Sequence, residues 1–158
     1  MHELTLALTA VEADPKSPTY KSNRAAAYMS AGRYQAALDD CKEADELDPG
    51  NAKTLHRLAR IYTSMGRPQE ALDVFARIQP AASETDMMQA KVMQQHIKGA
   101  EEQIHTGTSG SMALHALDQA AKGLGSSVVE PRKWRLLRCE AYLKMGNVNA
   151  LGLSLIHI

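Results

Sequence analysis

Residues 20–37 read YKSNRAAAYMSAGRYQAA, and residues 54–71, which start 34 positions later, read TLHRLARIYTSMGRPQEA. Small, aromatic and glycine residues recur in the same order in both stretches. The residues that match at this spacing are Pro15 and Pro49, Ala25 and Ala59, Tyr28 and Tyr62, Gly32 and Gly66, Arg33 and Arg67, and Ala37-Leu38-Asp39 with Ala71-Leu72-Asp73. A fixed period of this length indicates a supersecondary unit that is repeated along the chain.

The shared residues have the properties that a pair of packed helices requires. Ala25 is small enough for two helices to cross closely, and Tyr28 can fill the seam to the next unit. Gly32 suits the left-handed conformation that ends a helix. The sequence therefore predicts an all-α fold of stacked helix–turn–helix units. Period and spacing resemble the tetratricopeptide repeat (TPR), whose units form a superhelical solenoid.

Past residue 80 the period degrades, but helical patterns continue. Ser83 and Asp86 have the spacing of a capping box, and the helix that follows is expected to be longer than a usual repeat arm, ending near 107–110. A second helix is expected over 112–124. RCEAYLKMG at 138–146 echoes RAAAYMSAG at 24–32, which predicts a further first helix with Pro131 in its first turn.

These patterns divide the chain into four parts. We predict the second helix of one repeat plus two full repeats over 1–80, an irregular long hairpin over 81–125, a further first helix over 126–150, and a non-native or truncated tail over 151–158. The tail, LGLSLIHI, has no polar face of the kind a solvent-facing helix needs. Residues 1–14 are interpreted as a second helix whose first helix is absent. Because repeat ends without a polar cap expose apolar surface, self-association through these ends is a further expectation.

Charge and cysteine usage narrow the classes of function. The chain has 18 basic and 18 acidic side chains, so it has no electrostatic footprint of a nucleic-acid-binding protein. Cys41 and Cys139 are isolated and fall at packing positions, which favours structural thiols in a reducing compartment, here the cytoplasm. No signal peptide and no membrane span is predicted. The six histidines lack metal-ligand spacing, and we predict no metal, no cofactor and no enzymatic activity.

A possible binding groove follows from the register. First helices of stacked repeats line the concave surface, and Asn23 and Arg57 occupy equivalent sites on adjacent first helices. Lys53 shares a face with Arg57 because it lies four residues away. These three residues suit a peptide carboxylate, since Lys and Arg supply charge-assisted hydrogen bonds and Asn adds an amide donor. Further groove-lining candidates are Ser22, Ala26, His56 and Arg60. A solvated, charge-balanced helix face would leave the same pattern.

A closer resemblance favours the binding interpretation. YKSNRAAAY followed by NAKTLHRLARIY resembles the carboxylate-clamp TPR domains of co-chaperones. The resemblance implies that Asn23, Lys53 and Arg57 hold the acidic C-terminus of heat-shock protein 70 or 90. The family clamp also uses a Lys and an Asn from the preceding first helix, which implies that three of five clamp residues are present. Lys21 departs from the aromatic or aliphatic residue that the family often has at this packing site.

The resemblance also extends along most of the chain. Over roughly residues 8–150 it is similar to the N-terminal repeats of J-domain TPR co-chaperones, notably the fungal members. No His-Pro-Asp tripeptide, the mark of a J domain, occurs. The predicted function is therefore that of a non-enzymatic module that binds chaperone tails and supports client folding or transfer. Two alternatives stay open: a general TPR scaffold for another partner, and a TPR segment attached to a catalytic domain such as a prolyl isomerase or phosphatase.

Overall fold

The computed structural model describes residues 2–106 and 110–146, which form eight helices and contain no strand. The predicted all-α class is confirmed. In chain order the helices are α1 (His2–Ala13), α2 (Pro18–Ser30), α3 (Tyr34–Leu47), α4 (Ala52–Ser64), α5 (Pro68–Phe75), α6 (Glu84–His105), α7 (Gly110–Ala121) and α8 (Arg132–Lys144). The predicted tail over 151–158 lies outside the described residues.

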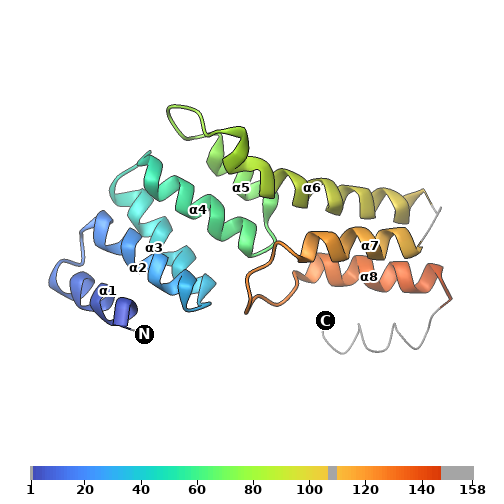
Figure 1. The fold of residues 1–158 in the computed structure, drawn as a ribbon, viewed down its shortest axis with the longest axis horizontal. Coiled ribbons are helices and arrows are strands. Elements are labelled where there is room, and N and C mark those ends of the chain that lie inside the picture. Colours follow the sequence, from blue (N-terminus) through green and yellow to red (C-terminus); the bar gives the residue numbers. More distant parts are fainter. Residues whose placement is uncertain (1, 107–109, 147–158) are drawn as a thin grey trace.

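The helices stack as antiparallel hairpins in an elongated array (Figure 1). Each helix contacts its neighbour in the chain, and α2 also contacts α4, α4 contacts α6, and α6 contacts α8. The even-numbered helices therefore form one layer, and α3, α5 and α7 lie behind them. This is the solenoid arrangement that the 34-residue period predicts.

Side-chain caps fix where several of these helices begin. Ser17 and Asn51 accept hydrogen bonds from the backbone N–H groups of Tyr20 and Thr54, at the starts of α2 and α4. The predicted capping box is present at the start of α6, where Ser83 and Asp86 bond to each other's backbone N–H groups. Helix α6 has 22 residues, more than any other described helix, as its sequence pattern predicts.

Alanine lies where the paired helices cross. Ala25 on α2 and Ala37 on α3, like Ala59 on α4 and Ala71 on α5 in the next unit, are fully buried and belong to one hydrophobic core. Close helix contact leaves no space for larger side chains at these positions. The burial that their predicted packing roles require is present.

Two hydrophobic cores lie side by side along the array. The first is formed by α2 to α5, with Leu38 and Leu55 among its fully buried side chains. The second lies among α6, α7 and α8 around Leu117 and Trp134. Helix α6 belongs to both, because Ala90 packs in the first core and the residues from Met93 onward pack in the second. Its extra length carries the chain from one core to the other.

A return loop, residues 122–131, runs back from α7 to the first core (Figure 1). The Gly125 backbone N–H donates to the carbonyl of Ser64, at a distance of 2.8 Å, and the Ser127 hydroxyl donates to the carbonyl of Gly32. Gly125 also lies against the ring of Tyr34. The loop therefore ties the second half of the chain to the turns of the two regular repeats.

Replacing Gly66 tests the packing of this loop. Gly66 and Gly50 both have positive φ values, 73° and 82°, so alanine costs each about 1 kcal/mol in backbone strain. A methyl group at residue 66 would also lie 2.7 Å from Pro131 Cγ, whereas the space around Gly50 is open. We expect Gly66→Ala to lower the free energy of unfolding by at least about 2 kcal/mol, and Gly50→Ala by about half as much. Urea denaturation measures both, and equal losses would contradict the described position of the loop.

Candidate functional site

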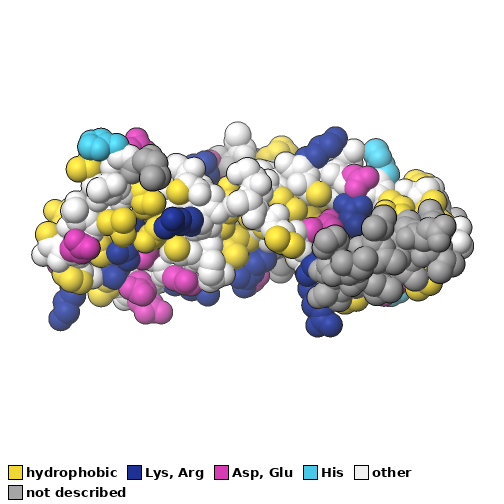
Figure 2. All heavy atoms as spheres, turned by 90° about the horizontal axis from the view of Figure 1, so that it is seen from below, with side chains coloured by type: hydrophobic (Ala, Val, Ile, Leu, Met, Phe, Trp, Pro, Cys, Tyr) yellow, Lys and Arg dark blue, Asp and Glu magenta, His cyan; other side chains and the backbone are white. Residues whose placement is uncertain are grey.

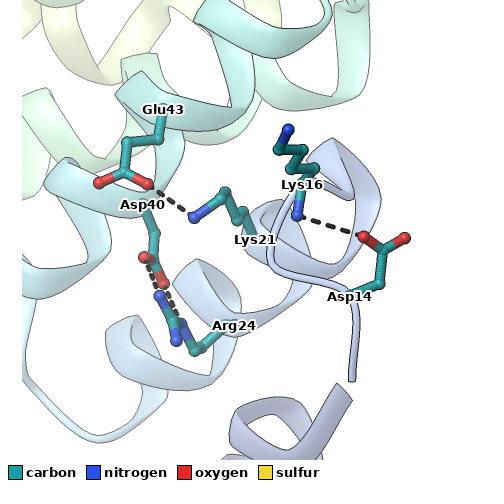
Figure 3. A network of polar contacts seen from close by, with 6 residues as sticks. All are labelled: Asp14, Lys16, Lys21, Arg24, Asp40 and Glu43. Atoms are coloured by element: carbon teal, nitrogen blue, oxygen red, sulfur yellow. Dashed lines mark hydrogen bonds and ion pairs between the residues drawn. The ribbon is translucent and has the colours of Figure 1, made fainter. Parts of the chain in front are cut away.

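A polar seam joins α2, which carries Asn23, to α3 (Figure 3). Lys21 Nζ lies 2.6 Å from a Glu43 carboxylate oxygen, and Arg24 forms two hydrogen bonds, 2.6 and 2.7 Å long, to the carboxylate of Asp40. Lys21 is buried. The ion pair lets a lysine occupy this place and holds α2 firmly against α3.

Asn23 and Lys53 line one small pocket, of about 40 Å³, between α2 and α4. Both residues are exposed, and their side chains make no hydrogen bond or ion pair to the described part of the chain. Pro18, Thr19, Ser22 and Thr54 complete the walls, together with Asp48 and Asn51 from the turn between α3 and α4. The pocket thus offers one ammonium group and one amide next to a carboxylate, Asp48, that is hydrogen-bonded by Asn51.

Arg57 lies one turn along α4 from Lys53 and is half-buried. Its Nη1 donates to the carbonyl and to the hydroxyl of Ser22, the hydroxyl at 2.6 Å, and Thr54 donates to the same hydroxyl. Burial lowers the pKa of the Arg57 guanidinium, with Cys41 opposing and the charge of Arg60 adding to the decrease. The group remains a cation at neutral pH. Its Nε and Nη2 make no hydrogen bond within the described residues.

The remaining predicted groove residues have different surroundings. Ala26 lies with Asn23 in a wider hollow of about 390 Å³ between α1 and α2. Arg60 is exposed on α4. His56 packs edge-on against the ring of Phe75, with 5.9 Å between ring centroids, and so faces α5. The structure therefore brings Ser22, Asn23 and Lys53 together in one pocket. Arg57 does not line this pocket and is joined to it through Ser22, and His56 faces Phe75 instead.

Four residues that line the pocket were not predicted as groove residues: Pro18, Asp48, Asn51 and Thr54. Asn51 is the N-cap of α4, and an Asn that precedes a helical run is a signal that could have placed it at this helix end. Burial raises the pKa of the nearby Cys41 thiol to about 12, so this cysteine stays protonated and unreactive at neutral pH. Neither a metal-binding group of His, Cys, Asp and Glu nor a helix fit to cross a membrane is found within 2–106 and 110–146.

Comparisons with known proteins agree with the repeat and the fold. A family model of the tetratricopeptide repeat matches residues 28–92. Small glutamine-rich tetratricopeptide repeat-containing protein 2 of Mycosarcoma maydis is 43% identical over 43% of this chain and 19% of its own length. The TPR repeat-containing thioredoxin TTL4 of Arabidopsis thaliana is 27% identical over a match that covers 94% of this chain and 21% of the length of TTL4.

A third relative is the DnaJ homolog subfamily C member 7 homolog of Schizosaccharomyces pombe. It is 27% identical over a match that covers 78% of this chain and 20% of the length of the relative. The chain thus spans about a fifth of the length of these curated relatives. Among solved structures, the TPR domain of P58(IPK) superposes with a TM-score of 0.73 at 22% identity, over 98% of this chain and 44% of that one. Residues 28–92 therefore match the tetratricopeptide-repeat family, and the described helices share the solenoid fold of a TPR domain.

Proposed function

We propose that this chain is the protein-interaction module of a J-domain co-chaperone, and that it binds the acidic C-terminal tails of heat-shock protein 70 or 90. In this proposal it works in the cytoplasm, has no catalytic activity of its own and supports client folding or transfer. The main support is that Asn23 and Lys53 share one pocket between α2 and α4 without a hydrogen bond to a described residue. Arg57 lies one turn further along α4, and its Nη1 donates to Ser22, which lines the same pocket. A relative named as a DnaJ homolog supports the co-chaperone context.

The binding mode follows from the chemistry of the three side chains. A peptide carboxylate would accept hydrogen bonds from the Lys53 ammonium and the free guanidinium nitrogens of Arg57, and the Asn23 amide would donate a third. Charge-assisted hydrogen bonds of this kind contribute about 1.5–3 kcal/mol each. The chain has no net charge, and Asp48 lies in the same pocket. Affinity therefore depends on local contacts and falls as salt screens them.

Arg57→Ala tests this mode against a matched control. Titration calorimetry with an acidic peptide that ends in a free carboxylate should show binding weakened about tenfold or more, because one charge-assisted contact is lost. Lys42→Ala removes a positive charge from an exposed side chain on α3, outside the pocket of Asn23 and Lys53, and should change the affinity less than threefold. If both substitutions reduce binding equally, general charge attraction rather than the proposed contacts holds the peptide.

A second candidate has support from one relative. A TPR repeat-containing thioredoxin matches 94% of this chain. The second candidate is therefore that the module serves as the interaction segment of a protein with a catalytic domain. In that case the groove would bind a partner other than a chaperone tail. Binding of the acidic peptide that is unaffected by Asn23→Ala, Lys53→Ala and Arg57→Ala would favour this second candidate.

A further inference from the structure

A second pocket lies at the joint between the two cores, away from Asn23, Lys53 and Arg57. Its volume is about 440 Å³, and its walls come from the N-terminal end of α5, the middle of α6 and the N-terminal end of α8, three helices that meet near the centre of Figure 1. The joint opens where α6 leaves the first core and enters the second. The pocket shares no lining residue with the small pocket of Asn23 and Lys53.

The floor of this joint pocket is apolar. It is formed by Trp134, Ile97, Pro68 and Pro131, and Trp134 and Ile97 are only 2% and 8% exposed. Pockets that bind ligands combine such apolar walls with a few placed polar groups, in volumes of about 300–1,000 Å³. The space is therefore sufficient for one large apolar side chain and the backbone next to it.

The rim of the pocket carries an excess of one positive charge. Lys133 Nζ lies 2.5 Å from a Glu101 carboxylate oxygen, and Arg67 is paired with Glu70. Lys98 is exposed at the same rim and has no hydrogen-bond or ion-pair partner in the described part of the chain. Both rim carboxylates are thus neutralised, and Lys98 is left to attract a negative group beside the apolar floor.

We propose that the joint pocket binds an extended peptide segment of a partner protein, with a large apolar side chain on Trp134 and an adjacent acidic side chain at Lys98. Figure 2 shows basic and acidic side chains interspersed across the visible part of one face. A surface of this kind has little general attraction for an acidic peptide, so the peptide must be held by local contacts such as that with Lys98. Recognition here needs an internal acidic residue and no chain terminus. The site therefore stands or fails independently of the proposed chaperone-tail site.

Trp134 is the only tryptophan of the chain, so its fluorescence reports directly on the pocket. The probe is the blocked peptide acetyl-Gly-Ser-Leu-Asp-Ser-Gly-amide, which lacks a free carboxyl terminus. We expect a saturable change in tryptophan emission. Leucine replaced by alanine in the peptide should weaken binding at least tenfold through lost apolar burial, and aspartate replaced by asparagine about fivefold.

Charge reversal at the rim gives the matched comparison. Lys98→Glu should lower the affinity for the probe peptide about tenfold. Lys42→Glu should leave this affinity unchanged, because Lys42 is exposed on α3, outside the pocket. Arg57→Ala should also have no effect, which separates this site from the one that binds a terminal carboxylate. An unsaturable signal, or equal losses for Lys98→Glu and Lys42→Glu, would overturn the proposal. So would a concentration-dependent emission change without peptide that sedimentation assigns to dimers, since a second copy would then occupy the pocket.

Discussion

Arg24→Met should lower the free energy of unfolding by about 3 kcal/mol. The Asp40 side chain is 7% exposed, and Arg24 is the partner that forms two hydrogen bonds to its carboxylate. The hydrogen bond to Asp40 raises the pKa of Arg24 even though burial acts in the opposite direction. Methionine keeps most of the apolar stem but leaves a buried carboxylate without its cation, a change that typically costs about 3–5 kcal/mol. Urea denaturation at neutral pH measures the loss.

Two further variants show whether the buried charge is the cause. Arg24→Met combined with Asp40→Leu should recover most of the lost stability, because a buried ion pair can be replaced by apolar side chains of similar size. Lys91→Met breaks an exposed ion pair with Glu84 and should cost less than about 1 kcal/mol. A loss for Arg24→Met no larger than that for Lys91→Met would show that the seam between α2 and α3 does not depend on this pair.

Leu117→Ala should lower the free energy of unfolding of the second core by about 3 kcal/mol. Leu117 is fully buried among α6, α7 and α8, and deletion of such a side chain removes apolar burial and leaves a cavity. Trp134 lies in the same core, so tryptophan fluorescence follows this half, whereas far-ultraviolet circular dichroism follows all helices. Because repeat arrays are stabilised by neighbouring contacts, we expect the fluorescence transition to move to lower urea than the dichroism transition.

Leu38→Ala provides the matched substitution in the first core. Leu38 is 1% exposed and lies on α3, so its loss should move the dichroism transition with a smaller shift in tryptophan fluorescence. Opposite probe patterns for the two leucines are expected from two cores that share α6. Coincident shifts of both probes in both variants would instead indicate one cooperative core across the joint.

The repeat made most of the fold predictable from the sequence. A 34-residue register fixes which alanines meet at helix crossings and which glycines end a helix, and the structure buries Ala25 and Ala59 and gives Gly32 and Gly66 positive φ values. The long α6 was predictable as well, because its cap at Ser83 and its apolar spacing are local features. Helix periodicity and capping depend on neighbouring residues, which is why sequence patterns report them well.

Contacts between distant segments were not predictable in the same way. The sequence predicts only a loop after α7, yet Gly125 and Ser127 bond to the turns of the two regular repeats. Nothing local in GLGSSVV indicates where it packs, since its partners lie far back in the chain. The contact of His56 with Phe75 was not predictable for the same reason, because Phe75 lies on another helix, α5. The register could align Asn23 with Arg57, but the bonds from Arg57 to Ser22 depend on how α2 and α4 pack.

The most direct test of the proposed function compares two forms of one acidic peptide, with a free C-terminal carboxylate and with a C-terminal amide. Titration calorimetry of this chain with each form isolates the terminal charge that Asn23, Lys53 and Arg57 are proposed to bind. We predict that the free acid binds at least about fivefold more tightly than the amide and that added salt narrows the difference. Equal affinities for the two forms would contradict the carboxylate site.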